Sequence, residues 1–131
     1  MYARTGGGVT LSGGEATAQF DFCLELLEKL NAAQIHTCLD TCGQCEPMHF
    51  ARLCAAASMV LYDIKHTDPD RHRALTGVSN RLILANFALL GKMRVPVEVR
   101  IPVTVSYTHL DVYKRQGLRL HACPAAADLP G

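Results

Sequence analysis

The chain has 131 residues, of which 49% are hydrophobic and 19% are charged, and this composition indicates one globular domain of ordinary type. Its formal net charge of +1 provides no long-range attraction for nucleic acid or for an anionic membrane, so we expect neither as a partner. The longest apolar stretch, residues 82–90, is too short for a membrane span, which needs about 20 residues.

Strand-like and helix-like patterns of apolar residues alternate along the chain. The first five predicted elements are a strand at 9–12, a helix at 17–31, a strand at 35–40, a helix at 47–56 and a strand at 59–64. A short helix from Asp68 to Leu75 follows, and a second helix begins at an Asn80 cap and ends near Lys92. The last predicted strand is at 95–103. These elements indicate an α/β fold of parallel βα units, in either a barrel or a doubly wound sheet.

A glycine-rich segment opens this pattern, because residues 6–15 read Gly-Gly-Gly-Val-Thr-Leu-Ser-Gly-Gly-Glu. Glycines lack a Cβ atom and let the backbone approach a bound molecule closely, and the Glu15 carboxylate is a charge partner for an ammonium group. A glycine-rich turn beside a strand is structural about as often as it is functional. Alone, the segment therefore indicates no more than a polar ligand at a strand end.

Polar residues also follow the later strands. They are Asp40 and Thr41, Asp63 and Lys65, and Arg100. Because the carboxyl ends of parallel strands meet at one edge of the sheet, where α/β folds gather their active sites, we expect a binding site there. Without further context, Asp63 and Lys65 would indicate only an ordinary ion pair at a strand end.

Ordered motifs extend along most of the chain. They are the segment at 6–15, Ile-His-Thr-Cys-Leu-Asp-Thr-Cys-Gly at 35–43, Leu-Tyr-Asp-Ile-Lys-His at 61–66, His72, Leu75 to Asn80, and Val99 to Pro102. Together they resemble the motifs of the glycyl-radical-enzyme activating enzymes, a branch of the radical S-adenosylmethionine superfamily. The resemblance covers residues 5–103 and implies part of a parallel (β/α) barrel within residues 1–104. It also implies a four-iron four-sulfur (4Fe-4S) cluster and S-adenosylmethionine bound at the unique iron of that cluster.

The resemblance implies roles for individual residues at the strand ends. Those expected to bind S-adenosylmethionine are Gly13, Gly14 and Glu15 at the methionine amino group, Asp63, Ile64 and Lys65 beside the carboxylate and ribose, and Arg100 at the carboxylate. Those expected to hold a monovalent cation near that carboxylate are Asp40, Thr41 and Asp63, with the Leu61 carbonyl as a candidate fourth ligand. Arginine and lysine are suitable partners for the carboxylate.

The implied reaction begins when the reduced cluster gives one electron to the sulfonium, which breaks a C–S bond and yields methionine and a 5′-deoxyadenosyl radical. This radical abstracts hydrogen from a glycine Cα of a partner enzyme, expected to be of the pyruvate formate-lyase type. Flavodoxin or ferredoxin is the expected electron donor. Because the protein mainly orients the cofactor and excludes water in such chemistry, no side chain is predicted to act as general acid, general base or nucleophile.

The six cysteines bear on where the cluster would bind. No signal-peptide pattern opens the chain, so we expect a cytoplasmic protein with reduced thiols or metal ligands rather than disulfides. The resemblance places a Cys-x3-Cys-x2-Cys motif before the Gly-Gly-Glu turn, and no cysteine precedes Gly6. Cys38, Cys42 and Cys45 have this spacing but follow the turn, and Cys38 is predicted within a strand that points it away from Cys42. We therefore expect the cluster ligands to be missing and the chain as written to be inactive.

Two alternative functions stay open. One is another radical S-adenosylmethionine branch that acts on a small substrate. The other is a small cysteine-rich metal-binding module built on Cys38, Cys42 and Cys45, since three thiolates leave one iron of a cluster open to a ligand.

The sequence changes character after residue 104. Residues 105–116, Val-Ser-Tyr-Thr-His-Leu-Asp-Val-Tyr-Lys-Arg-Gln, follow neither the strand nor the helix pattern. With a suitable Thr104 codon they can be encoded by a perfect inverted DNA repeat, which resembles two head-to-head transposase adapter ends used in sequencing libraries. We therefore expect residues 105–131 to be an adapter-derived or chimeric tail rather than a domain.

Overall fold

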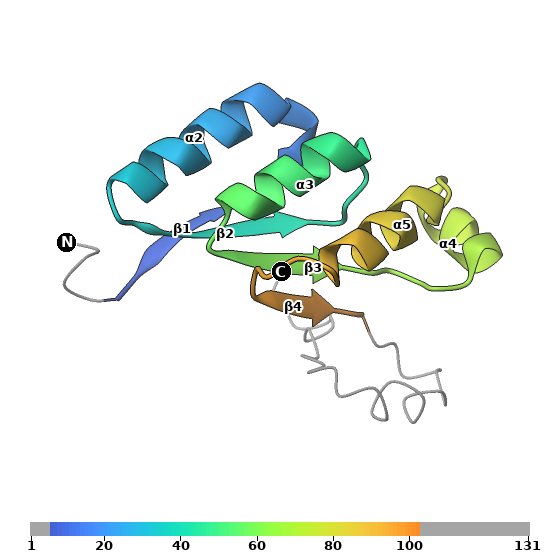
Figure 1. Cartoon of the computed structure of the whole chain (residues 1–131). Coiled ribbons are helices and arrows are strands. Elements are labelled where there is room, and N and C mark those ends of the chain that lie inside the picture. The colour runs from blue at the N-terminus through green and yellow to red at the C-terminus, as the bar shows by residue number, and fades with distance from the viewer. Residues whose placement is uncertain (1–5, 103–131) are drawn as a thin grey trace, which may run out of the picture.

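The computed structural model of the chain describes residues 6–102, and the tail predicted at 105–131 lies outside them (Figure 1). Four parallel strands form one sheet in the order β1-β2-β3-β4. Their bounds are Gly8–Leu11 for β1, His36–Thr41 for β2, Met59–Asp63 for β3 and Val97–Arg100 for β4. The order of the strands in the sheet is their order in the sequence, as in a barrel built from successive βα units.

The helices connect consecutive strands, and all except the one at 69–76 cover one face of the sheet (Figure 1). They are the 3-10 helix η1, Ala16–Gln19, and the α-helices α2, Phe20–Ala32, α3, Pro47–Ala56, α4, Pro69–Thr76, and α5, Arg81–Leu90. A doubly wound sheet carries helices on both faces, so this one-sided arrangement agrees with part of a barrel. Within residues 6–102, no helix combines the length and the apolarity that crossing a membrane requires.

The helices α3 and α4 begin at the residues that their capping signals indicate. Glu46 and Asp68 precede prolines at the first helical positions, and each carboxylate accepts a hydrogen bond of 2.9 Å from a backbone N–H of the first turn. Asn80 stands at the N-cap of α5, but its side chain makes no capping bond. The Asn80 amide donates instead to the carbonyl oxygens of His66 and Thr67, so it ties α5 to the preceding loop.

Two predicted elements differ from the observed ones by more than a small shift of both ends. The helix predicted at 17–31 begins as η1, where Glu15 acts as the cap and accepts from the Thr17 N–H at 3.4 Å. The strand predicted at 95–103 is observed as the shorter β4, which Pro96 and Pro102 flank. Proline has no N–H to donate to a strand ladder, and this confines it to strand ends.

The apolar core lies between the sheet and helices α2, α3 and α5. Its fully buried members are Leu27, Leu39, Phe50, Leu53, Cys54, Val60 and Tyr62. The Tyr62 ring contacts Phe50 edge-on and stacks on Phe87, with ring centroids 5.8 and 5.4 Å apart, and its hydroxyl donates to the Ile83 carbonyl at 2.6 Å. Each large apolar side chain contributes about 1.5 to 3 kcal/mol on burial, so this cluster fixes α3 and α5 over β3.

The two faces of the sheet differ because side chains alternate along each strand. The buried side chains that face the helices are Leu11, Thr37, Leu39, Thr41, Val60, Tyr62 and Val99. The other face, called the open face below, carries exposed or half-buried side chains, namely Thr10, Cys38, Asp40, Leu61, Asp63, Glu98 and Arg100. No helix of the described range covers the open face (Figure 1). A ligand can therefore reach the sheet from this side.

Candidate functional site

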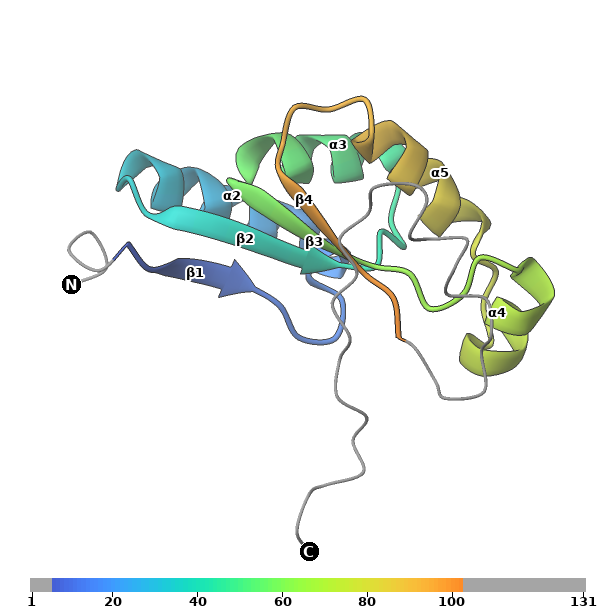
Figure 2. The same ribbon diagram turned by 90° about the horizontal axis from the view of Figure 1, so that it is seen from below.

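The residues predicted to form a site gather at the carboxyl ends of the four strands, which all point the same way (Figure 2). The turn at 12–15 follows β1, and the loop at 42–46 follows β2. Asp63 and Arg100 end β3 and β4 and are register partners on these adjacent strands. The side chains form two clusters, one around Glu15 and one around Arg100.

The Glu15 cluster joins the turn after β1 to the loop after β2. Glu15 Oε1 accepts hydrogen bonds from the Thr17 hydroxyl, at 2.7 Å, and from the Thr41 hydroxyl. Glu15 Oε2 accepts from the Cys42 backbone N–H at 3.1 Å and from the Cys42 thiol at 3.0 Å. A carboxylate has about four lone-pair sites, so these bonds leave the Glu15 side chain little capacity for direct contact with a ligand.

Electrostatics keep the Glu15 carboxyl group charged and the Cys42 thiol protonated. Burial alone would raise the pKa of Glu15, but hydrogen bonds from Cys42, Thr41 and Thr17 outweigh it and hold that pKa below its ordinary value of 4.5. Burial raises the pKa of Cys42 to about 11, and the hydrogen bond to Glu15 and the charge of Glu15 add to this effect. The thiolate is the metal-binding and nucleophilic form of cysteine, so Cys42 acts here as a hydrogen-bond donor.

Gly13 and Gly14 form an exposed turn directly before Glu15. Their φ angles are +94° and +31°, a region of backbone conformation that favours glycine. Apart from chain neighbours, no heavy atom lies within 4 Å of the position that a Cβ would take at either residue, so the backbone is open on that side. Because the Glu15 carboxylate is engaged, an ammonium group bound at this turn would have to use backbone carbonyls as its acceptors.

Arg100 bridges two carboxylates on the open face. Its Nε and Nη2 donate to the two oxygens of Asp63 at 2.9 and 3.0 Å, and Nη2 also donates to Asp40. The Ser12 hydroxyl donates to the other Asp40 oxygen at 3.2 Å, which links the glycine-rich turn to this cluster. Burial would lower the pKa of Arg100, but the hydrogen bonds and charges of Asp63 and Asp40 outweigh it and raise that pKa. The guanidinium therefore stays charged and compensates both carboxylates.

Other predicted site residues lie apart from these carboxylates. The Thr41 side chain is on the helix-covered face with Glu15, opposite the face that carries Asp40. Ile64 is buried, and its N–H donates to the Arg100 carbonyl at 3.0 Å, whereas Lys65 is exposed. The side-chain oxygens predicted to share a monovalent cation are thus divided between the two faces of the sheet.

The expected ligands fit these clusters to different degrees. The carbonyls of the glycine turn and the guanidinium of Arg100 match the ammonium and carboxylate groups of S-adenosylmethionine. A monovalent cation would have to compete with Arg100 for Asp40 and Asp63, because both carboxylates already share that guanidinium. A cluster does not fit, since no group of three His, Cys, Asp or Glu side chains within residues 6–102 could hold a metal ion. The thiols of the Cys-x3-Cys-x2-Cys sequence therefore do not converge.

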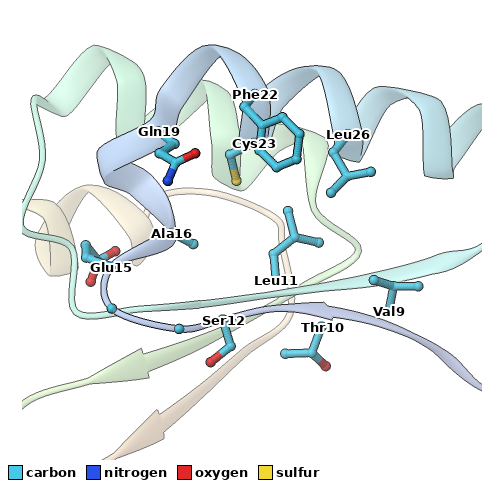
Figure 3. Close-up of a pocket in the computed structure, with 12 residues that line it drawn as sticks. Val9, Thr10, Leu11, Ser12, Glu15, Ala16, Gln19, Phe22, Cys23 and Leu26 are labelled. Carbon is cyan, nitrogen blue, oxygen red and sulfur yellow. The ribbon is translucent and has the colours of Figure 1, made fainter.

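A pocket of about 440 Å³ lies at the edge of the described sheet, between β1 and α2 (Figure 3). Leu11, Phe22 and Leu26 form its apolar walls, and the Gly-Gly-Glu turn lies at one end. Neither Arg100 nor Lys65 is among the residues that line it, so it offers no cationic partner for a carboxylate. The open face matches an amino-acid ligand better than this pocket does.

Sequence reasoning did not assign Ser12, Thr17 and Cys42 the contacts that the structure shows. Thr17 stands two residues after Glu15, and this spacing before a helix is a local signal for the observed capping bond. The sequence indicates Cys42 as a reduced loop thiol or a candidate cluster ligand and does not indicate its bond to Glu15. Its contact with Glu15 spans 27 positions of sequence, so no local pattern indicates it.

Glu15→Gln is expected to lower the free energy of unfolding at neutral pH by about 1 to 2 kcal/mol. The reason is that the NH2 group of the glutamine would face the hydroxyl, thiol and N–H donors that now bind the carboxylate. The pKa of Glu15 is depressed on folding, so its contribution is present above pH 4.5 and is lost as the pH falls through the lower folded-state pKa. Urea unfolding at several pH values should therefore show that the free energies of unfolding of the wild type and of Glu15→Gln approach each other below pH 4.5.

Glu46→Gln is the matched control for this variant. Glu46 is also a capping carboxylate, but it is exposed, and its hydrogen bond goes to the first turn of its own helix. We expect a smaller loss of stability for Glu46→Gln than for Glu15→Gln at neutral pH. Equal losses in the two variants would contradict a special role for the Glu15 cluster.

No protein-family model matches the chain. It is 42% identical over 106 residues to the trans-4-hydroxy-L-proline dehydratase activating enzyme of Clostridioides difficile, an alignment that covers 80% of this chain and 35% of that relative. It is 40% identical over 105 residues to the pyruvate formate-lyase-activating enzyme of Staphylococcus epidermidis, with 76% of this chain and 42% of that relative covered. The chain thus spans less than half the length of these curated relatives.

The fold is also similar to a solved structure, a domain of pyruvate-formate lyase-activating enzyme from Bacteroides vulgatus. The TM-score is 0.68 at 29% sequence identity, over 74% of this chain and 60% of that chain. The sequence and structure comparisons together confirm the resemblance that the ordered motifs indicated.

Proposed function

We infer that this chain is a segment of a glycyl-radical-enzyme activating enzyme, the family of the relatives that it matches over most of its length. We propose that it forms one wall of the S-adenosylmethionine site of such an enzyme. The main support is the continuous set of contacts at the carboxyl ends of the strands, from Ser12 through Asp40 to Arg100 and Asp63. This set brings the glycine-rich turn and the Arg100 guanidinium to one edge of the sheet, which supports binding of an ammonium group by the turn and of a carboxylate by Arg100.

The amino end of the ligand is proposed to lie against the turn of Gly13 and Gly14. Their backbone carbonyls would accept from its ammonium group, because the exposed turn has no Cβ atoms to crowd a ligand. The Glu15 carboxylate would act from behind the turn, as a fixed negative charge held by Thr17, Thr41 and Cys42. Glu15 thus contributes charge and backbone position to the site.

The carboxylate end of the ligand is proposed to bind Arg100 and Lys65. The hydrogen bonds of Arg100 to described residues use Nε and Nη2, which leaves Nη1 to donate to a ligand. Lys65 is exposed directly after β3 and can add a second positive charge, and the Asp63–Ile64 segment would lie beside the ribose. Of the predicted cation ligands Asp40, Thr41 and Asp63, the two aspartates would bind a monovalent cation only if Arg100 moved away from them, and the Thr41 hydroxyl would stay with Glu15 on the other face.

Bound beside a reduced 4Fe-4S cluster, S-adenosylmethionine supplies the radical chemistry that takes hydrogen from a glycine of the partner enzyme. The residues of this chain bind and orient the ligand by charge and by backbone contact. We propose that none of them transfers a proton in the reaction.

We further propose a cytoplasmic enzyme whose partner is a glycyl radical enzyme of the pyruvate formate-lyase type, with flavodoxin or ferredoxin as the electron donor. The names of the S. epidermidis relative and of the B. vulgatus domain support this partner. The name of the C. difficile relative specifies trans-4-hydroxy-L-proline dehydratase instead. The test below therefore uses both kinds of partner enzyme.

We propose that Cys38, Cys42 and Cys45 do not bind the cluster and that the 131-residue chain alone is inactive. Burial raises the pKa of all three thiols, which disfavours the thiolate form that binds iron. The Cys42 thiol is in addition committed to Glu15. The same observations count against a metal-binding module built on these three cysteines.

Grafting residues 6–102 into the C. difficile relative, in place of its matching segment, tests the function. The chimera should generate a glycyl radical, seen by electron paramagnetic resonance, when S-adenosylmethionine, a reductant and either partner enzyme are present. Each partner is assayed separately, so a signal with only one identifies the type. The chain alone should give no radical.

Three outcomes would contradict the proposal. A folded chimera that takes up as much iron as the recipient enzyme, yet does not cleave S-adenosylmethionine, would show that the graft does not form the proposed wall. Cys42→Ala in the graft should leave the iron content unchanged, and a loss of iron would favour the cysteine-based module. Cleavage of S-adenosylmethionine without a radical on either partner would favour the small-substrate branch.

A further inference from the structure

The loop after β2, residues 42–46, is clamped by a side chain of the last described helix. Asn86 of α5 is fully buried, and its Nδ2 donates to the carbonyl oxygens of Gly43 and Cys45, both at 2.8 Å. The two partners lie 43 and 41 residues earlier in the sequence. Both N–H groups of the amide are thus used on one short loop.

The loop is also fitted against the core. Gly43 has a φ of +73°, and a Cβ at this position would lie 2.0 Å from the Tyr62 hydroxyl oxygen, so the loop backbone packs directly on that ring. The Tyr62 hydroxyl donates to the carbonyl of Ile83 on α5. Helix α5, Tyr62 and the loop therefore form one packed unit.

This clamped loop is the one that holds the Glu15 carboxylate. The N–H and thiol of Cys42 donate to Glu15 Oε2. The Gly43 N–H donates to the Thr41 hydroxyl at 2.9 Å, and that hydroxyl donates to Glu15 Oε1. The position of the loop thus sets the position of three of the donors around Glu15.

We propose that Asn86 is a positioning residue for the Gly-Gly-Glu turn, acting through the loop at 42–46 to hold Cys42 and Thr41 against Glu15. This inference rests on the proposed function in so far as the turn binds S-adenosylmethionine. Asn86 touches neither Glu15 nor a ligand-facing group among the contacts that the structure describes, so its effect is indirect.

The second polar atom of Asn86 supports this role. Asn86 Oδ1 is the buried side-chain atom without a hydrogen-bond partner among the described residues. An unsatisfied buried acceptor is unfavourable, so an asparagine at this place is costly unless its N–H groups are needed. Without Asn86, the carbonyls of Gly43 and Cys45 would lose these donors inside the protein.

Asn80 provides a matched control. It is also buried, and its Nδ2 also donates to two successive loop carbonyls, those of His66 and Thr67, at 3.1 and 2.9 Å. That loop makes no contact with Glu15 among the interactions that the structure describes. The two asparagines therefore share chemistry and burial and differ in the loop that each one holds.

The test compares Asn86→Ala with Asn80→Ala in the full chain by amide hydrogen exchange. We expect the amides of Cys42 and Gly43 to exchange at least tenfold faster in Asn86→Ala and at an unchanged rate in Asn80→Ala. Equal exchange of these amides in both variants would overturn the proposal. If Asn86→Ala does not fold, Asn86→Ser, which keeps one donor, should show a smaller change confined to the same amides.

Affinity for S-adenosylmethionine, measured by calorimetry in the cluster-containing chimera that carries residues 6–102, gives the second readout. The dissociation constant should rise about tenfold in Asn86→Ala and less than twofold in Asn80→Ala. Adding Asn86→Ala to Glu15→Gln should cause no further loss, since both changes act on one carboxylate, and an additive loss would contradict the inference. If the chimera without further substitutions binds no S-adenosylmethionine, the proposed function fails, while the exchange data still decide the role of Asn86.

Discussion

Gly43→Ala should lower the free energy of unfolding by about 2 to 5 kcal/mol. The added Cβ would lie 2.0 Å from Tyr62 Oη and 2.6 Å from Tyr62 Cζ, and the backbone would keep a φ of +73°. The ring cannot easily move away, because it packs on Phe50 and Phe87. Urea unfolding followed by circular dichroism measures the loss.

Gly77→Ala is the control, because it has the same backbone strain without the clash. Gly77 ends α4 with a φ of +79°, and no heavy atom other than chain neighbours lies within 4 Å of the position that a Cβ would take there. We expect Gly77→Ala to cost about 1 to 2 kcal/mol, the usual penalty of the left-handed conformation. Equal losses for the two variants would show that the loop does not pack on Tyr62. Tyr62→Phe should restore part of the loss in Gly43→Ala, since it removes the closest atom.

The order and type of the secondary-structure elements could be predicted because their signals are local. The helix predicted at 47–56 matches α3 at both ends, since Glu46 supplies the cap and Pro47 starts the helix. The strand predicted at 35–40 is observed as β2, whose side-chain alternation puts Cys38 and Asp40 on one face. The ends of β4 were predicted less accurately. The apolar pattern continues through Pro96 and Pro102, but proline has no N–H to donate to the neighbouring strand.

The clusters of the site could be predicted only in part. The predicted strand ends put Asp40, Asp63 and Arg100 at the same edge of the sheet. Their ion pairs could not be predicted, because they depend on the sheet register, which aligns Asp63 with Arg100. The engagement of Glu15 by the loop after β2 depends on the path of that loop, and no spacing in the sequence reports it.

Asn86 illustrates a signal that is visible in the sequence but was not used. It is the polar residue within the otherwise apolar residues 82–90, and the structure shows it fully buried. A lone amide among apolar helix residues indicates either an exposed position or a buried hydrogen bond to another segment. Only the packing of α5 on the sheet decides whether Asn86 is exposed or buried in a hydrogen bond. Helical periodicity shows which residues share a face of the helix, but it does not identify the segment that Asn86 contacts.

Arg100→Ala should reduce affinity for S-adenosylmethionine at least about tenfold and lower the free energy of unfolding by about 2 to 3 kcal/mol. Asp40 and Asp63, whose side chains are only 18% and 25% exposed, would be left as neighbouring carboxylates without a cation. Removing one partner of a partly buried charge group leaves the others poorly solvated. Calorimetry measures the affinity, and urea unfolding measures the stability.

Two variants separate charge from geometry in this cluster. Arg94→Ala removes the same charge from an exposed position before β4 and should leave both quantities nearly unchanged. Arg100→Lys keeps the positive charge but loses the planar fork that reaches both Asp63 oxygens, so its losses should be intermediate. If Arg94→Ala lowers the affinity as much as Arg100→Ala, the effect is one of net charge, and Arg100 is not the carboxylate partner.

Arg100→Ala also tests whether Arg100 and a monovalent cation compete for the space between Asp40 and Asp63. In the wild type the guanidinium compensates both carboxylates, so KCl and choline chloride at equal ionic strength should give the same melting temperature. In Arg100→Ala the two carboxylates are available to an ion, and KCl should raise the melting temperature by several degrees over choline chloride, since about 1 kcal/mol corresponds to roughly 4 to 8 °C in a domain of this size.

A potassium effect of equal size in the wild type would mean that the ion binds without displacing Arg100. No potassium effect in either protein would mean that the aspartates alone do not form a cation site, which their separation from the Thr41 hydroxyl on the opposite face would explain.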